Sequence, residues 1–158
     1  MKNGKLDDVD RRILYELQRD ARRTSSGDIA KEIDISASTV RNRIQRLEAA
    51  GIIRGYHIDI DYERAGYPLY TKLICTAPID EREQLAKRAL EVPGVAAVRE
   101  VMTGDENVYI NAVGEDHDDL SRIGRELSAL GLRITEEELI RNEYVCPYHG
   151  FLGQERQD

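Results

Sequence analysis

Apolar residues at helical spacing predict two short helices near the start of the chain. Between Leu6 and Leu17 they recur at intervals of three, four, seven and eight residues, which predicts a helix over 7–19. Ser25 or Ser26 is expected to begin a second helix that ends near Ile33. Neither helix is long enough to be stable alone, so both are expected to share a core with a third.

The third predicted helix is the best defined of the three. Asp34 and Ile35 form a tight turn, and the hydroxyl of Ser36 suits an N-cap because it can accept a backbone N–H. Gly51 ends the helix, since glycine adopts a left-handed conformation at low steric cost. Between these two ends the helix carries one apolar stripe, formed by Val40, Ile44 and Leu47. This pattern is typical of a helix-turn-helix, and the residues after it, 52–53 and 58–60, are predicted to pair as the two short strands of a wing.

A different pattern begins after a Gly- and Pro-containing stretch at residues 62–68. The predicted elements from there on alternate between strands and helices, with Pro78 and Pro93-Gly94 as breaks between them. In order they are strand Leu69–Ala77, helix Glu81–Leu90, strand Val95–Thr103, strand Asn107–Val113, helix Asp118–Leu130 and strand Leu132–Val145. The order βαββαβ is the ferredoxin-like pattern.

These patterns predict an α+β protein: an N-terminal winged helix-turn-helix followed by a C-terminal ferredoxin-like βαββαβ domain. We expect the DNA-binding domain at residues 1–60, a linker at 61–68, the second domain at 69–146 and a C-terminal tail at 147–158.

The charge is distributed unevenly between these parts. The chain has a net charge of −7, but residues 1–60 carry 12 Lys and Arg against 10 Asp and Glu, whereas residues 61–158 carry 11 against 20. A basic footprint is therefore confined to the N-terminal part, and the acidic part is expected to face away from a nucleic acid. Arginine outnumbers lysine 18 to 5, which a salt-tolerant host and a GC-rich genome explain equally well.

The sequence favours a cytoplasmic protein. It contains only two cysteines, no apolar run of the length needed to cross a membrane, and no apolar core of a signal peptide near Met1. Phosphate-binding glycine loops and the common hydrolase and metalloprotease motifs are absent, so neither an enzyme nor a cofactor is predicted.

The polar side of the third helix is the candidate DNA-binding surface. It carries small, polar and basic side chains, of which Asn can bond adenine and Arg can bond guanine in the major groove. Arg43 borders the apolar stripe, and we expect it to clamp a phosphate or to brace the fold internally. The predicted DNA-binding residues are Ser36, Ser38, Thr39, Arg41, Asn42, Arg43, Arg46 and Arg54. A merely solvated polar face is the alternative.

The segment Cys146-Pro147-Tyr148-His149 suggests a metal site at first sight. Zinc needs three or four ligands, and we expect Cys75 to lie too far from Cys146 to help. No metal is therefore predicted, and we expect Tyr148 and Phe151 to pack on a neighbouring subunit.

Together these residues resemble the Lrp/AsnC family of prokaryotic transcriptional regulators. The resemblance covers about residues 6–145 and rests on three segments: L-D-D-V-D-R-R-I-L at 6–14, I-S-A-S-T-V-R-N-R-I-Q-R-L-E-A-A-G-I-I at 35–53, and V-M-T-G-D at 101–105. It implies binding to double-stranded DNA by a homodimer or higher even oligomer joined through the C-terminal sheets.

The resemblance also implies a small-molecule effector, commonly an amino acid, bound in the second domain. The implied site comprises Thr103, Gly104, Asp105, Glu106, Asn107 and Thr135. The family usually continues Gly-Asp with Tyr-Asp and carries alternating threonines in its last strand, whereas this chain has Glu106-Asn107 and three glutamates at 136–138. Extra carboxylates favour an amine-bearing ligand, and a plain hairpin turn at 103–107 remains the alternative.

Two other functions remain open. Siroheme decarboxylases resemble this family but typically follow the third helix with an Arg-Arg-Phe-Gly-like segment. This chain has Arg54-Gly55-Tyr56-His57 there, which fits the regulators better. An effector-sensing partner protein with weak DNA binding is the second alternative.

Overall fold

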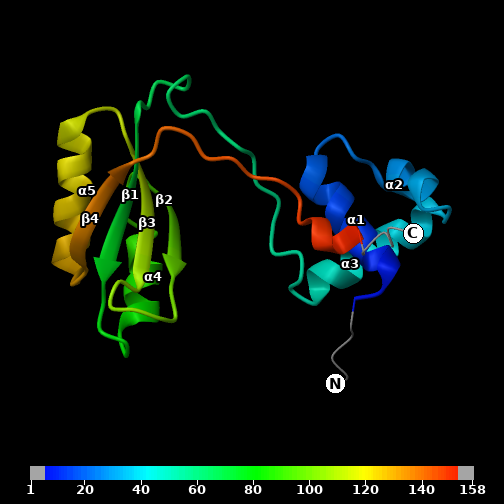
Figure 1. The fold of residues 1–158 in the computed structure, drawn as a ribbon, viewed down its shortest axis with the longest axis horizontal. Coiled ribbons are helices and arrows are strands. Elements are labelled where there is room, and N and C mark those ends of the chain that lie inside the picture. The colour runs from blue at the N-terminus through cyan, green and yellow to red at the C-terminus, as the bar shows by residue number, and fades with distance from the viewer. Residues whose placement is uncertain (1–5, 153–158) are drawn as a thin grey trace, which may run out of the picture. The chain divides into compact units, whose positions relative to one another are not determined.

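The structure of the protein is a computed structural model that describes residues 6–152. These residues fold into two compact units (Figure 1). Within those residues, the helical unit runs to Ile58 and resumes at Tyr144, and the sheet unit comprises Asp59–Glu143. The ends of the predicted N-terminal domain and of the predicted tail, residues 1–5 and 153–158, lie outside the described part of the chain.

The helical unit contains the three predicted helices. They are α1 (Asp8–Asp20), α2 (Ser26–Glu32) and α3 (Ala37–Ala49), each preceded by an N-cap whose side chain accepts a backbone N–H from the first turn. Their apolar faces meet in one core made of Ile13, Leu14, Ile29, Ala30, Val40 and Leu47. The shared core explains how a seven-residue helix such as α2 is held in place.

The strands predicted for the wing at 52–53 and 58–60 do not form. The N–H groups of Ile52 and Ile53 instead donate to the carbonyl of Leu47 just past the end of α3, and the chain forms no strand between Ile53 and Leu69. An isolated two-stranded hairpin is barely stable, and Ile58 is 79% exposed, so burial adds nothing to hold a strand there.

The C-terminal segment belongs to the helical unit. Its last described residues form a short 3₁₀ helix, η1 (His149–Leu152), beside α1. Phe151 packs against the helical core, and the Tyr148 N–H donates to Gln18 Oε1 at 3.1 Å. Phe151 therefore packs within its own chain and not on a neighbouring subunit as expected, whereas Tyr148 is 63% exposed and its expected packing on a neighbour stays a prediction.

The sheet unit has the predicted βαββαβ order. Its elements are β1 (Leu69–Thr76), α4 (Arg82–Ala89), β2 (Val95–Glu100), β3 (Val108–Gly114), α5 (His117–Leu130) and β4 (Arg133–Leu139). The strands lie in the order β2-β3-β1-β4, with every neighbouring pair antiparallel (Figure 1). Both helices contribute to one core with the strands, including Leu85 and Ala89 from α4 and Ile123 and Leu127 from α5. The predicted α+β class and ferredoxin-like topology are confirmed.

Two strands are shorter than predicted, and in both cases the partner strand sets the limit. The last pair between β2 and β3 is Glu100 with Val108, and beyond it a single hydrogen bond follows, from the Val101 N–H to the Asn107 carbonyl. β4 stops at Leu139, opposite Thr71, because β1 itself begins only two residues earlier, after Pro68.

The two cysteines are free and differ in exposure. Cys75 is fully buried in the sheet unit, and burial raises the pKa of its thiol to about 11, whereas Cys146 is exposed in the helical unit. Among residues 6–152, no group of three or more His, Cys, Asp or Glu side chains is placed to hold a metal ion.

Candidate nucleic-acid interface

The start of α3 is fixed by a hydroxyl cluster. Asp34 takes a positive φ of 53° in the turn, and Ser36 Oγ accepts the Thr39 N–H at 3.1 Å. The same oxygen lies 2.8 Å from both Ser38 Oγ and Thr39 Oγ1. The three predicted hydroxyl residues therefore lie together at the helix N-terminus, where the backbone dipole favours an anion such as a DNA phosphate.

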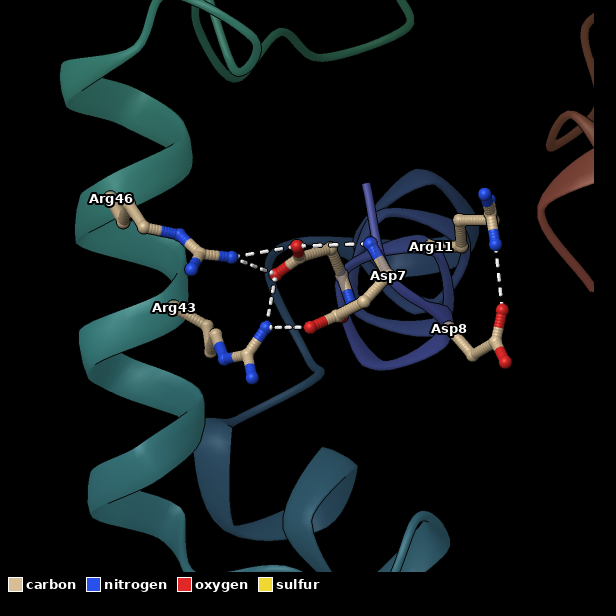
Figure 2. A network of polar contacts seen from close by, with 6 residues as sticks. Asp7, Asp8, Arg11, Arg43 and Arg46 are labelled. Atoms are coloured by element: carbon tan, nitrogen blue, oxygen red, sulfur yellow. Dashed lines mark hydrogen bonds and ion pairs between the residues drawn. The ribbon is translucent and has the colours of Figure 1, made fainter. Parts of the chain in front are cut away.

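Two arginines of α3 are engaged with the start of α1 (Figure 2). Arg46 Nη2 donates to both carboxylate oxygens of Asp10, at 2.7 and 2.6 Å, and Arg43 Nη1 donates to Asp10 Oδ1 at 3.1 Å. Arg43 also donates to Asp7. We call these four residues, Asp7, Asp10, Arg43 and Arg46, the Asp–Arg cluster.

The cluster is built on a buried carboxylate. Asp10 is only 2% exposed, and burying its carboxyl group without hydrogen-bonding partners would be costly. Asp7 and Asp10 also form the capping box of α1, in which each side chain accepts the backbone N–H of the other residue. The hydrogen bond from Arg43, followed by the backbone bond from Asp10, lowers the pKa of Asp7, and the same pairing raises the pKa of Arg43.

This geometry changes the prediction for Arg46. Its guanidinium was expected to face a base, but in the structure it bonds to Asp10, 36 residues earlier in the chain. Arg43 braces the fold internally, which is one of the two roles expected for it. The spacing Asp7–Asp10 is a recognisable capping-box signal, and it could have revealed the buried acid.

The remaining basic and amide side chains predicted to bind DNA are exposed. Within residues 6–152, Arg41, Asn42 and Arg54 make no side-chain hydrogen bond or ion pair. Arg41 and Asn42 project from α3, and Arg54 lies in the irregular segment after it. These groups are available to an external ligand.

The predicted effector residues divide into two groups. Asn107 is 4% exposed, and its amide accepts the Ala77 N–H at 2.9 Å and donates to the Ala77 carbonyl at 2.8 Å. The structure thus uses the Asn107 side chain to hold the chain after β1, not to face a ligand.

The other predicted effector residues are exposed. Thr135 Oγ1 donates to the Ile74 carbonyl and lies 3.0 Å from Glu106 Oε1, which brings residues from two separate parts of the sequence together. Thr103, Gly104 and Asp105 lie in the loop between β2 and β3.

Comparisons with known proteins agree with this arrangement. Residues 6–54 match a family described as winged helix-turn-helix DNA-binding. The regulator LrpA of Pyrococcus horikoshii is 36% identical over 121 residues, which is 75% of this chain and 82% of that protein. The regulator AldR of Mycolicibacterium smegmatis is 30% identical over 119 residues, covering 74% of this chain and 69% of that protein.

The chain belongs to the Lrp/AsnC family of transcriptional regulators.

Solved structures of this family share the fold. The leucine response regulatory protein of Mycobacterium tuberculosis superimposes with a TM-score of 0.75 at 25% identity, over 89% of this chain and 95% of that one. A Neisseria meningitidis regulator solved in complex with L-Met gives a TM-score of 0.71 at 23% identity, over 90% and 94% of the chains. The match to the DNA-binding family and the similarity to the regulator LrpA show that this Lrp/AsnC protein is a DNA-binding transcriptional regulator. None of its helices within residues 6–152 is long and apolar enough to span a membrane.

A cleft in the sheet unit was not anticipated from the sequence of this Lrp/AsnC protein. It has a volume of about 520 Å³ and is bordered by residues 59–63, 67–68, 70 and 139–143. Tyr62 and Tyr70 lie in it with ring centres 5.2 Å apart, and the Tyr70 hydroxyl donates to Glu143. None of the predicted effector residues lines this cleft.

Proposed function

We propose that this Lrp/AsnC regulator binds specific double-stranded DNA through the exposed polar side of α3. The observation that carries the proposal is the division of that helix. Arg43 and Arg46 are held by α1, whereas Arg41 and Asn42 have no partner among residues 6–152. Unpaired amide and guanidinium groups on a capped helix suit base edges in the major groove.

The remaining predicted contacts fit phosphate groups. The hydroxyls of Ser36, Ser38 and Thr39 lie at the N-terminus of α3, where an anion is favoured. Arg54 extends from the segment after α3 and is also expected to meet the backbone. Such contacts position the protein on DNA without selecting a sequence.

Substitution of Asn42 tests the proposal. A binding site is first obtained by sequencing genomic fragments that co-purify with the protein. We expect Asn42→Ala to weaken binding to that site about tenfold or more while leaving binding to random DNA nearly unchanged. Asn142→Ala, which removes an exposed amide from the sheet unit, is the matched control. Equal losses on both DNAs would refute base recognition by Asn42.

We further propose that a small effector, an amino acid or a related amine, binds the sheet unit near Glu106 and Thr135. The contact between these two side chains joins the β2–β3 loop to β4. The Neisseria regulator in complex with L-Met supports an amino acid as the class of ligand. Glu136 and Glu137 are exposed on β4 beside Thr135, and their carboxylates favour a ligand that carries an amine.

Calorimetry with the twenty amino acids and simple diamines tests this second proposal. Binding is expected for at least one amine-bearing compound, and Glu106→Gln should weaken it while Glu83→Gln, on α4, should not. An absence of heat for every compound at millimolar concentration would contradict the proposal.

We infer that the protein acts in the cytoplasm as a homodimer or higher even oligomer, and by binding and not by catalysis. Two-fold symmetry would present two copies of α3 to half-sites spaced by about one helical turn of DNA or a multiple of it. Sedimentation analysis checks the assembly, for which a monomer at micromolar concentration would be the contrary result.

A further inference from the structure

The direction of each side chain on α3 identifies one more polar residue on its outer side. Leu47 is 1% exposed and marks the direction of the core. At about 100° per residue, Asn42 points about 140° away from Leu47 and Gln45 about 160° away. Arg46 points only about 100° away, on the side where it meets Asp10. Gln45 therefore faces outward more directly than Arg46.

Gln45 also has the chemistry of a base-reading residue. It is exposed, and within residues 6–152 its amide makes no side-chain hydrogen bond. An amide can bond the N6 and N7 atoms of adenine with two hydrogen bonds in the major groove. Arg46 cannot take this role, because a guanidinium only donates hydrogen bonds and cannot accept one from the adenine N6 amino group. Its Nη2 is also engaged with both carboxylate oxygens of Asp10.

The spacing of Asn42 and Gln45 suits neighbouring base pairs. Residues three apart on a helix lie on the same side, separated by about 4.5 Å along the helix axis. The distance between successive bases along one strand is about 3.4 Å. Two amides with this separation can reach adjacent or nearly adjacent bases.

We propose that Gln45, together with Asn42, recognises adenine in the DNA site, and that Arg46 is a positioning residue which holds α3 against α1. This inference rests on the proposed DNA-binding function and assigns the residues that give it sequence preference. The preferred half-site should therefore contain two adenines in adjacent or nearly adjacent base pairs. They can lie on the same strand or on opposite strands.

Selection from a random DNA pool with the full-length chain tests the assignment. The wild type is expected to enrich a two-fold symmetric motif with adenine preferences in each half. Gln45→Ala should reduce one of these preferences about tenfold or more in both halves and leave the others unchanged. Gln84→Ala, which removes an exposed glutamine from α4, is the matched control and should return the wild-type motif.

Arg46 variants provide the second half of the test. Arg46→Ala should lower the melting temperature and keep every base preference of the wild type. If Arg46→Ala does not fold, Arg46→Lys, which keeps the charge but loses the paired bonds, should give the same motif. Loss of a base preference in either variant would overturn the positioning role.

The remaining outcomes separate this inference from the function on which it rests. An unchanged motif for Gln45→Ala, with a clear motif for the wild type, would overturn the role of Gln45 and leave DNA recognition intact. No enriched motif for the wild type would overturn both.

Discussion

The two units bury polar groups in opposite ways. Within the described residues 6–152, the helical unit buries two charged residues, Asp10 and Glu16, each held by arginines. The sheet unit buries two neutral ones, Thr71 and Asn107. A buried charge depends on its partners far more than a buried neutral group does.

The difference has a functional meaning for α3. The Asp–Arg cluster joins the DNA-binding helix to α1 through charged groups that lie beside the proposed DNA surface. Asn107, in contrast, bonds to two backbone atoms inside the sheet unit. The orientation of α3 should therefore respond to changes of charge that leave the sheet unit unaffected.

The largest effect is expected when Asp10 loses both arginines. In Arg43→Met/Arg46→Met the buried carboxylate has no basic partner, which should destabilise the helical unit by about 3–5 kcal/mol. Hydrogen exchange of the α1 and α3 amides measures this loss without interference from the sheet unit.

The matched control removes the same charge from unpaired positions. Arg41→Met/Arg54→Met should change the exchange of these amides very little. Adding Asp10→Asn to Arg43→Met/Arg46→Met should restore part of the lost stability, since the unpaired charge is then gone. If Arg41→Met/Arg54→Met destabilises the unit as much as Arg43→Met/Arg46→Met does, the ion pairs with Asp10 are not what stabilises the helix.

A smaller effect is expected in the sheet unit. Asn107→Ala leaves the N–H and the carbonyl of Ala77 without partners, and Ala77 is 3% exposed. Each unpaired buried group costs about 1–3 kcal/mol, so a loss of about 2 kcal/mol or more is expected in the exchange of β1 and β3 amides. The same variant should leave the exchange rates of the α1 and α3 amides unchanged. Sheet amides that exchange no faster than in the wild type, or more slowly, would contradict this role for Asn107.

The smallest effect is expected from acid. The pKa of Asp7 is lowered in the folded state below its ordinary value of 3.8, mainly by the hydrogen bond from Arg43. The stabilisation is therefore complete above about pH 4 and is lost as the pH falls through the lowered value.

Asp7 is half exposed, so the change should amount to less than about 1 kcal/mol. It is measured as the difference between wild type and Asp7→Asn in α1 exchange across the acid range. A difference that persists unchanged to the lowest pH would exclude titration of Asp7 as the cause.

The sequence predicts those elements whose signals are local. The caps and apolar stripe of α3 are contained within residues 36–51, and the αβ alternation follows from short apolar runs separated by Pro and Gly. The ends of β2 and β4 were missed because strand length depends on where the partner strand begins, which no local pattern encodes.

The side-chain roles were harder to predict for the same reason. Ser36 caps its own helix, and its role follows from its position. The contacts of Arg46 and Asn107 were not predicted, because the partner of Arg46 lies on another helix and the partner of Asn107, Ala77, lies 30 residues earlier. Periodicity shows which residues are polar and exposed, but tertiary contacts decide which of them are already occupied.

The division of α3 is tested most directly by side-chain NMR during addition of a selected DNA site to the full-length chain. The side-chain amide signals of Asn42 and Gln45 are expected to shift on binding, while the guanidinium signals of Arg43 and Arg46 keep the positions they have in the free protein. A large shift of the Arg46 signal with unmoved Asn42 and Gln45 amides would contradict the account.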